Sequence, residues 1–95
     1  MKRVIVACNS GVATSQTIVS NLENMLEEKG VDTSNVEFIA IDNRQTEYYL
    51  PSADVFVYTI RPDIEINIPT IDGVKFLVGV GAEDELERLI ELIKD

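Results

Sequence analysis

The chain has 95 residues, of which 45% are hydrophobic, a length that suffices for one compact domain but not for two. Eight Lys and Arg against seventeen Asp and Glu give a formal net charge of -9, which would repel the phosphate backbone of a nucleic acid. A single cysteine and no histidine exclude an internal disulfide, a Cys/His zinc site and a Ser-His or Cys-His nucleophilic pair. We therefore expect one domain over residues 1–95 that does not bind nucleic acid.

Four short segments rich in β-branched and aromatic residues are the predicted strands. They are residues 4–7, 36–41, 55–58 and 75–78. The first of them begins almost at the N-terminus, so we expect no signal peptide before it. No apolar run approaches the roughly 20 residues that a membrane-spanning helix needs, which predicts a cytoplasmic protein.

Apolar residues at helical spacing predict helices at residues 15–29 and 82–94, the second of them amphipathic with an acidic start. A shorter helix is expected over residues 43–49, where Asn43 could cap the first turn and Pro51 would end the helix. The neighbouring rings of Tyr48 and Tyr49 fall at its end, and we expect one of them to pack against the sheet.

This alternation of strands and helices predicts an α/β fold with a four-stranded parallel sheet, doubly wound, with helices on both faces. We expect the strand order 2-1-3-4, which makes the first strand central. Such sheets bind ligands beyond the carboxyl ends of their strands, where the order reverses. The loop that follows the first strand is therefore the first place to look for a site.

That loop contains the residues that could react with or bind a ligand. It reads Cys8, Asn9, Ser10, Gly11, Val12, Ala13, Thr14 and Ser15. Because Gly11 allows a tight turn and Ser15 opens the predicted helix, successive N–H groups from Asn9 to Ser15 could converge on one anion. A helix N-terminus also favours the thiolate form of a cysteine, and the hydroxyls of Ser10, Thr14 and Ser15 could bind phosphoryl oxygens without acting as general acids. Cys8 is thus predicted to be both nucleophile and phosphate carrier, although a small buried apolar role is the alternative.

The same eight residues closely resemble the phosphorylation loop of enzyme IIB components of the bacterial sugar phosphotransferase system (PTS), most of all its galactitol-type branch. Members share a Cys-x-x-Gly-Val-Ala-Thr-Ser loop after an apolar strand, and a Gly-x-Gly before an acidic terminal helix, like Gly79-Val80-Gly81 here. The resemblance implies a phosphocysteine at Cys8, loaded from a phosphohistidine on a IIA partner. It further implies transfer to a sugar, galactitol or a related one, that the membrane-embedded IIC partner holds.

Low-molecular-weight tyrosine phosphatases resemble the arrangement too, but they have an arginine six residues after the cysteine, where this chain has Thr14. The stretch Arg61-Pro62-Asp63 offers an aspartate beyond the third strand, in surroundings that do not match well. Arg61 lies near the edge that carries Cys8, so it could help to hold phosphate, or it could be a solvated loop arginine. Without a cationic clamp in the loop, transfer is favoured over hydrolysis.

Residues elsewhere in the chain raise three other functions. A dinucleotide site would use Asp42 at the end of the second strand, but the glycine pattern fails and Asp42 is better read as a loop or capping residue. The acidic cluster Glu83, Asp84, Glu85 and Glu87 is better explained by the helix dipole than by a divalent cation, so we expect no metal and no cofactor. A regulatory domain whose phosphorylation reports sugar supply remains open.

Overall fold

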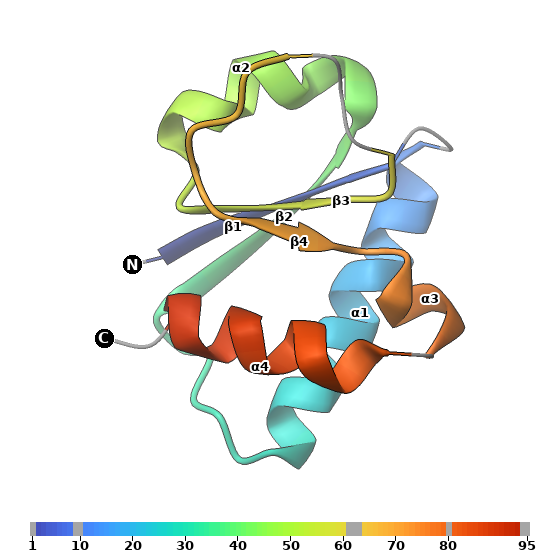
Figure 1. Cartoon of the computed structure of the whole chain (residues 1–95), viewed down its shortest axis with the longest axis vertical. Coiled ribbons are helices and arrows are strands. Elements are labelled where there is room, and N and C mark those ends of the chain that lie inside the picture. Colours follow the sequence, from blue (N-terminus) through green and yellow to red (C-terminus); the bar gives the residue numbers. More distant parts are fainter. Residues whose placement is uncertain (1, 9–10, 61–63, 80, 94–95) are drawn as a thin grey trace.

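The computed structural model describes residues 2–8, 11–60, 64–79 and 81–93. One four-stranded sheet has the order β2-β1-β3-β4, and every neighbouring pair is parallel. The strands are β1 at Lys2–Cys8, β2 at Val36–Asp42, β3 at Val55–Tyr58 and β4 at Thr70–Asp72. Figure 1 shows the sheet between α2 above it and α1 and α4 below it. The predicted parallel sheet and its strand order are confirmed.

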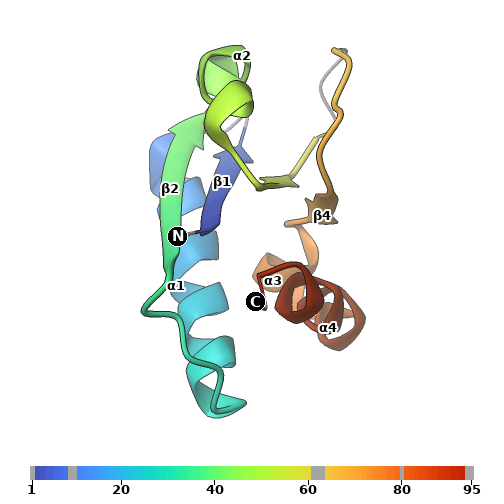
Figure 2. The ribbon, with the colours of Figure 1, turned by 90° about the vertical axis from the view of Figure 1, so that its left-hand side faces the viewer.

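The larger core fills the space between one face of the sheet and three helices, α1 at Val12–Glu28, α3 at Lys75–Val78 and α4 at Ala82–Ile93. Figure 2 shows α1 and α4 from the side, on either side of the lower part of the fold. The buried residues of this core alternate along the strands and keep helical spacing on the helices: Val4, Val6, Val55, Val57, Ile18, Leu22, Leu26, Leu86 and Leu89. Among the described residues no helix is both long and apolar enough to cross a membrane.

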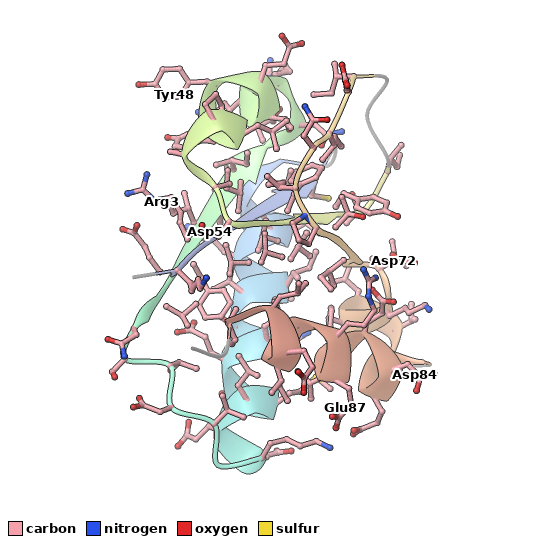
Figure 3. All side chains as sticks on the ribbon, turned by 60° about the vertical axis from the view of Figure 1, so that its left-hand side comes forward. Arg3, Tyr48, Asp54, Asp72, Asp84 and Glu87 are labelled. Carbon is pink, nitrogen blue, oxygen red and sulfur yellow. The ribbon has the colours of Figure 1, made fainter. Side chains whose placement is uncertain are left out.

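The opposite face has a thinner cover. It consists of a 3₁₀ turn at Asn43–Gln45, the short helix α2 at Thr46–Tyr49, and a second 3₁₀ turn at Leu50–Ser52. Tyr49 packs against the core of this face, whereas Tyr48 is 81% exposed and points away from the sheet in Figure 3. Helices thus cover both faces, and the expectation that one tyrosine ring packs against the sheet is confirmed.

The predicted fourth strand is wrong. Residues 75–78 form helix α3, and the fourth strand lies a few residues earlier, where Ile71 pairs with Val57 of β3. At the end of this strand the Asp72 carboxylate accepts a hydrogen bond from the Val74 N–H at 3.1 Å, and the chain turns there into α3. A four-residue apolar run fits either a strand or one helical turn, so periodicity could not separate them.

The short helical stretch runs from Asn43 to Tyr49 as predicted, but its capping residue and its continuation differ from the prediction. Asp42, not Asn43, is the capping residue, and its side chain and that of Gln45 form a reciprocal capping box. Pro51 does not end the helical path, which continues to Ser52. Proline is tolerated there because it occupies the first turn of the second 3₁₀ segment, where its missing N–H breaks no hydrogen bond.

Helix α1 begins at Val12, three residues before the predicted start at Ser15. Gly11 is its N-terminal capping residue and has φ 106° and ψ 176°. A side chain would be strained at this positive φ, so glycine permits a turn sharp enough to start the helix directly after the strand. The terminal helix α4 matches its prediction and buries Ala82, Leu86, Leu89 and Ile93 on one face.

Candidate functional site

Cys8 is the last residue of the central strand β1 and stands in register with Asp42, the last residue of β2. Its side chain is 2% exposed. Successive side chains of a strand point to opposite faces, so Cys8 shares its face with Val4 and Val6, which pack against α1. The thiol therefore lies at the carboxyl end of the sheet, on the side to which the chain crosses to form α1.

The N-terminus of α1 follows within three residues of Cys8. The Gly11 N–H donates a hydrogen bond to the Cys8 carbonyl at 3.3 Å, and the Ser15 N–H donates to the Gly11 carbonyl at 3.4 Å. The N–H groups of Val12, Ala13 and Thr14 precede that first helical bond, at the end where a helix leaves N–H groups without carbonyls of its own. No acidic side chain lies in the first turn, so the positive end of this 17-residue helix is not offset there.

The Ser15 hydroxyl makes a contact that the sequence did not predict. It donates a hydrogen bond to the carbonyl of Ile41 at 2.8 Å, and Ser15 is fully buried. The single hydroxyl proton is thereby committed to joining the first turn of α1 to β2. The Ser15 hydroxyl positions the helix, whereas Thr14, half-buried one residue earlier, lies nearer the start of the helix.

The carboxylate nearest to Cys8 along the sheet is paired with a cation. Asp42 accepts hydrogen bonds from the backbone N–H and the Nε of Arg44, at 2.9 and 3.0 Å. These hydrogen bonds hold the pKa of Asp42 below its ordinary value, so it is ionised at neutral pH and its charge is offset by the guanidinium. The expectation that Asp42 is a capping residue is confirmed.

Of the remaining predicted site residues, Asn9, Ser10 and Arg61 lie outside the described part of the chain, as do Pro62 and Asp63. Phosphate binding by Asn9 and Ser10 therefore stays a prediction, and both readings of Arg61, as a phosphate ligand or as a solvated loop residue, stay open.

The acidic start of α4 makes specific contacts. Lys29 binds Glu83 at 2.8 Å and Glu87 at 3.4 Å, and the hydrogen bond that the Lys29 ammonium donates to Glu83 is the main cause of the raised pKa of Lys29. Glu83 and Glu87 are largely exposed, as expected for carboxylates that complement a helix dipole. Glu85 differs, since it turns inward and accepts a hydrogen bond from the Asp72 N–H at 2.8 Å. Figure 3 shows Asp72 and Glu87 on this side of the molecule.

Three polar side chains at the same edge of the sheet were not predicted as site residues, although Asn43 was expected to cap the short helix. Asn43 Oδ1, Thr46 Oγ1 and Thr59 Oγ1 are buried atoms without a hydrogen-bond partner. Asn43 and Thr46 come soon after β2, and Thr59 directly follows β3, so they flank the strand that ends in Cys8. One signal in the sequence could have identified them. A polar residue that directly follows a buried strand next to β1 is a candidate for the site.

The family model for the lactose/cellobiose-specific IIB subunit of the PTS matches residues 3–88. A doubly wound sheet with a cysteine and a helix N-terminus at the carboxyl end of its central strand agrees with that match. The chain belongs to this family of IIB components, which take part in sugar-specific phosphoryl transfer. Membership gives it a phosphotransferase role in general terms and implies IIA and IIC partner components.

Named relatives are similar over nearly their whole length. The "Putative phosphotransferase enzyme IIB component SgcB" of Escherichia coli strain K12 is 27% identical over 93 residues, covering 98% of this chain and 97% of that protein. The galactitol-specific EIIB component of Escherichia coli O157:H7 is 26% identical over 94 residues, with the same coverage. Its counterpart in strain K12 is 23% identical over 94 residues, again with that coverage.

Proposed function

We propose that residues 1–95 act as one IIB domain that carries a phosphoryl group on Cys8. The group comes from a phosphohistidine of a IIA partner and goes to a sugar held by a membrane IIC partner. One observation carries the proposal: Cys8 ends the central strand directly before the N-terminus of a 17-residue helix. A thiolate and a bound phosphoryl group are both stabilised by such a helix end.

Two displacements at phosphorus make up the relay. In the first, the Cys8 thiolate forms the S–P bond while the P–N bond of the phosphohistidine breaks, and the electron pair of that bond stays with the imidazole. In the second, a sugar hydroxyl oxygen forms the new O–P bond, and the electron pair of the S–P bond returns to the thiolate. The hydroxyl proton passes to a base on the membrane partner, so this chain needs no general base of its own.

The described part of the loop supplies hydrogen-bond donors and no cation. The N–H groups of Val12, Ala13 and Thr14 and the Thr14 hydroxyl are proposed to bind the phosphoryl oxygens, together with Asn9 and Ser10. Thr14 stands where a tyrosine phosphatase of similar layout has its arginine. A site without that clamp stabilises the hydrolytic transition state less, which favours a carrier that retains its phosphoryl group.

The edge around the site also suits transient protein contacts. Several of the large apolar residues with exposed side chains follow the carboxyl ends of strands: Val12, Ile60, Val74, Leu77 and Val78. In Figure 1 the start of α1 and helix α3 both lie on the right-hand side of the molecule, with α1 starting higher. Apolar patches at a site rim are typical of protein-docking surfaces, and successive docking of two partners is what a relay requires.

As the sugar we propose galactitol or a related compound. This rests on the printed names of relatives at 23% and 26% identity, while the family model is described as specific for lactose and cellobiose. Sugar phosphorylation assays with the matching IIC component and both kinds of substrate would decide between the two classes.

Intact-protein mass spectrometry after incubation with phosphorylated IIA tests the central step. We expect one added phosphoryl group on the wild type and none on Cys8→Ser, with similar thermal unfolding of the two proteins because the volumes are close. A phosphoryl group on nitrogen or on a carboxylate in the wild type, or normal relay by a folded Cys8→Ser, would refute the proposal.

A further inference from the structure

The hydroxyl of Thr59 is buried without a hydrogen-bond partner. The large majority of buried side-chain polar atoms in proteins do find a partner, because an orphaned one loses its hydration and gains nothing. The unphosphorylated protein leaves this donor unused. A group that arrives only in another state of the protein would explain its position.

Sheet register places Thr59 beside the cysteine. Ala7 of β1 pairs with Tyr58 of β3, so continuing both strands by one residue brings Cys8 and Thr59 next to each other. Neighbouring strands lie about 4.8 Å apart, within the reach of two short side chains and a phosphoryl group between them.

Strand alternation also places the two side chains on the same face. Val57 of β3 packs in the core beneath α1, and Thr59 lies two residues further along the chain. Cys8 has the same relation to Val6, which packs in the same core. Extending the alternation of β3 by one residue, into the bend at Thr59, assigns the thiol and the Thr59 hydroxyl to the face on which α1 begins.

The other two unpartnered atoms fit a phosphoryl group less well. Asn43 Oδ1 is an acceptor, and an acceptor repels phosphoryl oxygens. Thr46 is buried to 98% on α2, which covers the opposite face of the sheet, the face of Ala7 rather than that of Cys8. Thr59 is the residue whose register, face and chemistry agree.

We propose that the Thr59 hydroxyl is a further phosphoryl ligand, which donates a hydrogen bond to an oxygen of the group on Cys8. This inference rests on the proposed function of Cys8. A hydroxyl donating to a charged phosphoryl oxygen forms one of the stronger hydrogen bonds, and here it forms only when the phosphoryl group is present. Thr59 thereby stabilises the phosphorylated state and the transfer that leads to it.

Thr59→Val removes the hydroxyl at nearly constant volume. Because that hydroxyl has no partner in the unphosphorylated protein, the variant should unfold at the same temperature as the wild type or higher. Its phosphorylation by phosphorylated IIA, followed as S-linked adduct over time, should be slower by about tenfold or more. Thr59→Ser keeps the hydroxyl and should transfer close to the wild-type rate.

Thr46→Val is the matched control, since it removes an equally unpartnered and buried hydroxyl from the opposite face. We expect no loss of stability and no change in the transfer rate. Should Thr59→Val fail to fold, Thr59→Ala replaces it and is compared with Thr59→Ser in the same assay.

Wild-type transfer by a folded Thr59→Val, or an equal slowing in Thr46→Val, would overturn the assignment of Thr59. A lower unfolding temperature of unphosphorylated Thr59→Val than of Thr46→Val would also overturn it, because the hydroxyl would then have a structural role. If the wild type forms no S-linked adduct at all, the proposed function of Cys8 fails first. The two failures are distinguished by the wild-type sample.

Discussion

Replacing Ser15 by alanine tests how the N-terminus of α1 is held in place. The Ser15 hydroxyl donates to the Ile41 carbonyl at 2.8 Å, between two groups 26 residues apart in the chain. Ser15 and Ile41 are 0% and 1% exposed, so water cannot replace the lost donor without a rearrangement. Ser15→Ala should therefore lower the free energy of unfolding.

The size of the loss follows from two opposing contributions. Removing one partner of a buried hydrogen bond costs about 1–3 kcal/mol, because the carbonyl that remains is desolvated. Alanine has the higher helix propensity and recovers roughly 0.5 kcal/mol. A net loss of about 0.5–2.5 kcal/mol remains, and in a domain of this size each kcal/mol corresponds to about 4–8 °C in Tm.

Urea and thermal unfolding followed by circular dichroism measure this loss. Ser20→Ala is the matched control, because Ser20 is an exposed serine on the same helix and shows the propensity gain alone. If Ser15→Ala is as stable as Ser20→Ala but is no longer phosphorylated, the helix-anchoring argument is wrong. The Ser15 hydroxyl would then be the phosphoryl ligand that the sequence predicted.

Two further variants probe the same edge of the sheet. A Cβ at Gly73 would lie 2.9 Å from Val57 Cγ1 and 3.0 Å from the Tyr58 carbonyl oxygen. Gly73→Ala should therefore lower the free energy of unfolding, measured by urea titration, by about 1–3 kcal/mol. Wild-type stability of the variant would show that the neighbouring atoms move away at no cost. For Asp42, hydrogen bonds from Arg44 lower the pKa in the folded state, so its stabilisation is present above the ordinary value of 3.8 and lost as the pH falls below it. Asp42→Asn should accordingly show a shallower loss of Tm between neutral pH and about pH 2, and an unchanged acid profile would exclude Asp42 as a contributor.

Much of the fold could be predicted because its signals are local. Three runs of β-branched residues formed strands where they were expected, and helical spacing located α1 and α4. The fourth strand was misplaced because residues 75–78 carry four consecutive apolar or amphipathic side chains, a pattern shared by a buried strand and a single helical turn. The turn at Gly73 and the left-handed Gly79, with φ 84°, decided in favour of the helix.

The backbone turn after Cys8 follows from local sequence, whereas the contacts of the side chains around it do not. The positive φ of Gly11 and the helix N-terminus after Cys8 follow from residue type and order, which the sequence displays. The partner of the Ser15 hydroxyl depends on where a distant strand ends, and no local pattern encodes that. Thr59 could not be predicted for the same reason, since its position next to Cys8 depends on the register of β1 and β3.

Ser15 and Thr59 show how hydroxyls of similar chemistry separate into two roles at one edge. The Ser15 hydroxyl has a buried carbonyl to donate to, so removing it should weaken the unphosphorylated protein. The Thr59 hydroxyl has none, so removing it should leave that protein intact and weaken only the phosphorylated state. Stability and transfer measurements on both variants therefore give opposite patterns if the assignments are right. The Thr59 hydroxyl is thus recognised as a phosphoryl ligand by its lack of a hydrogen-bond partner in the unphosphorylated protein.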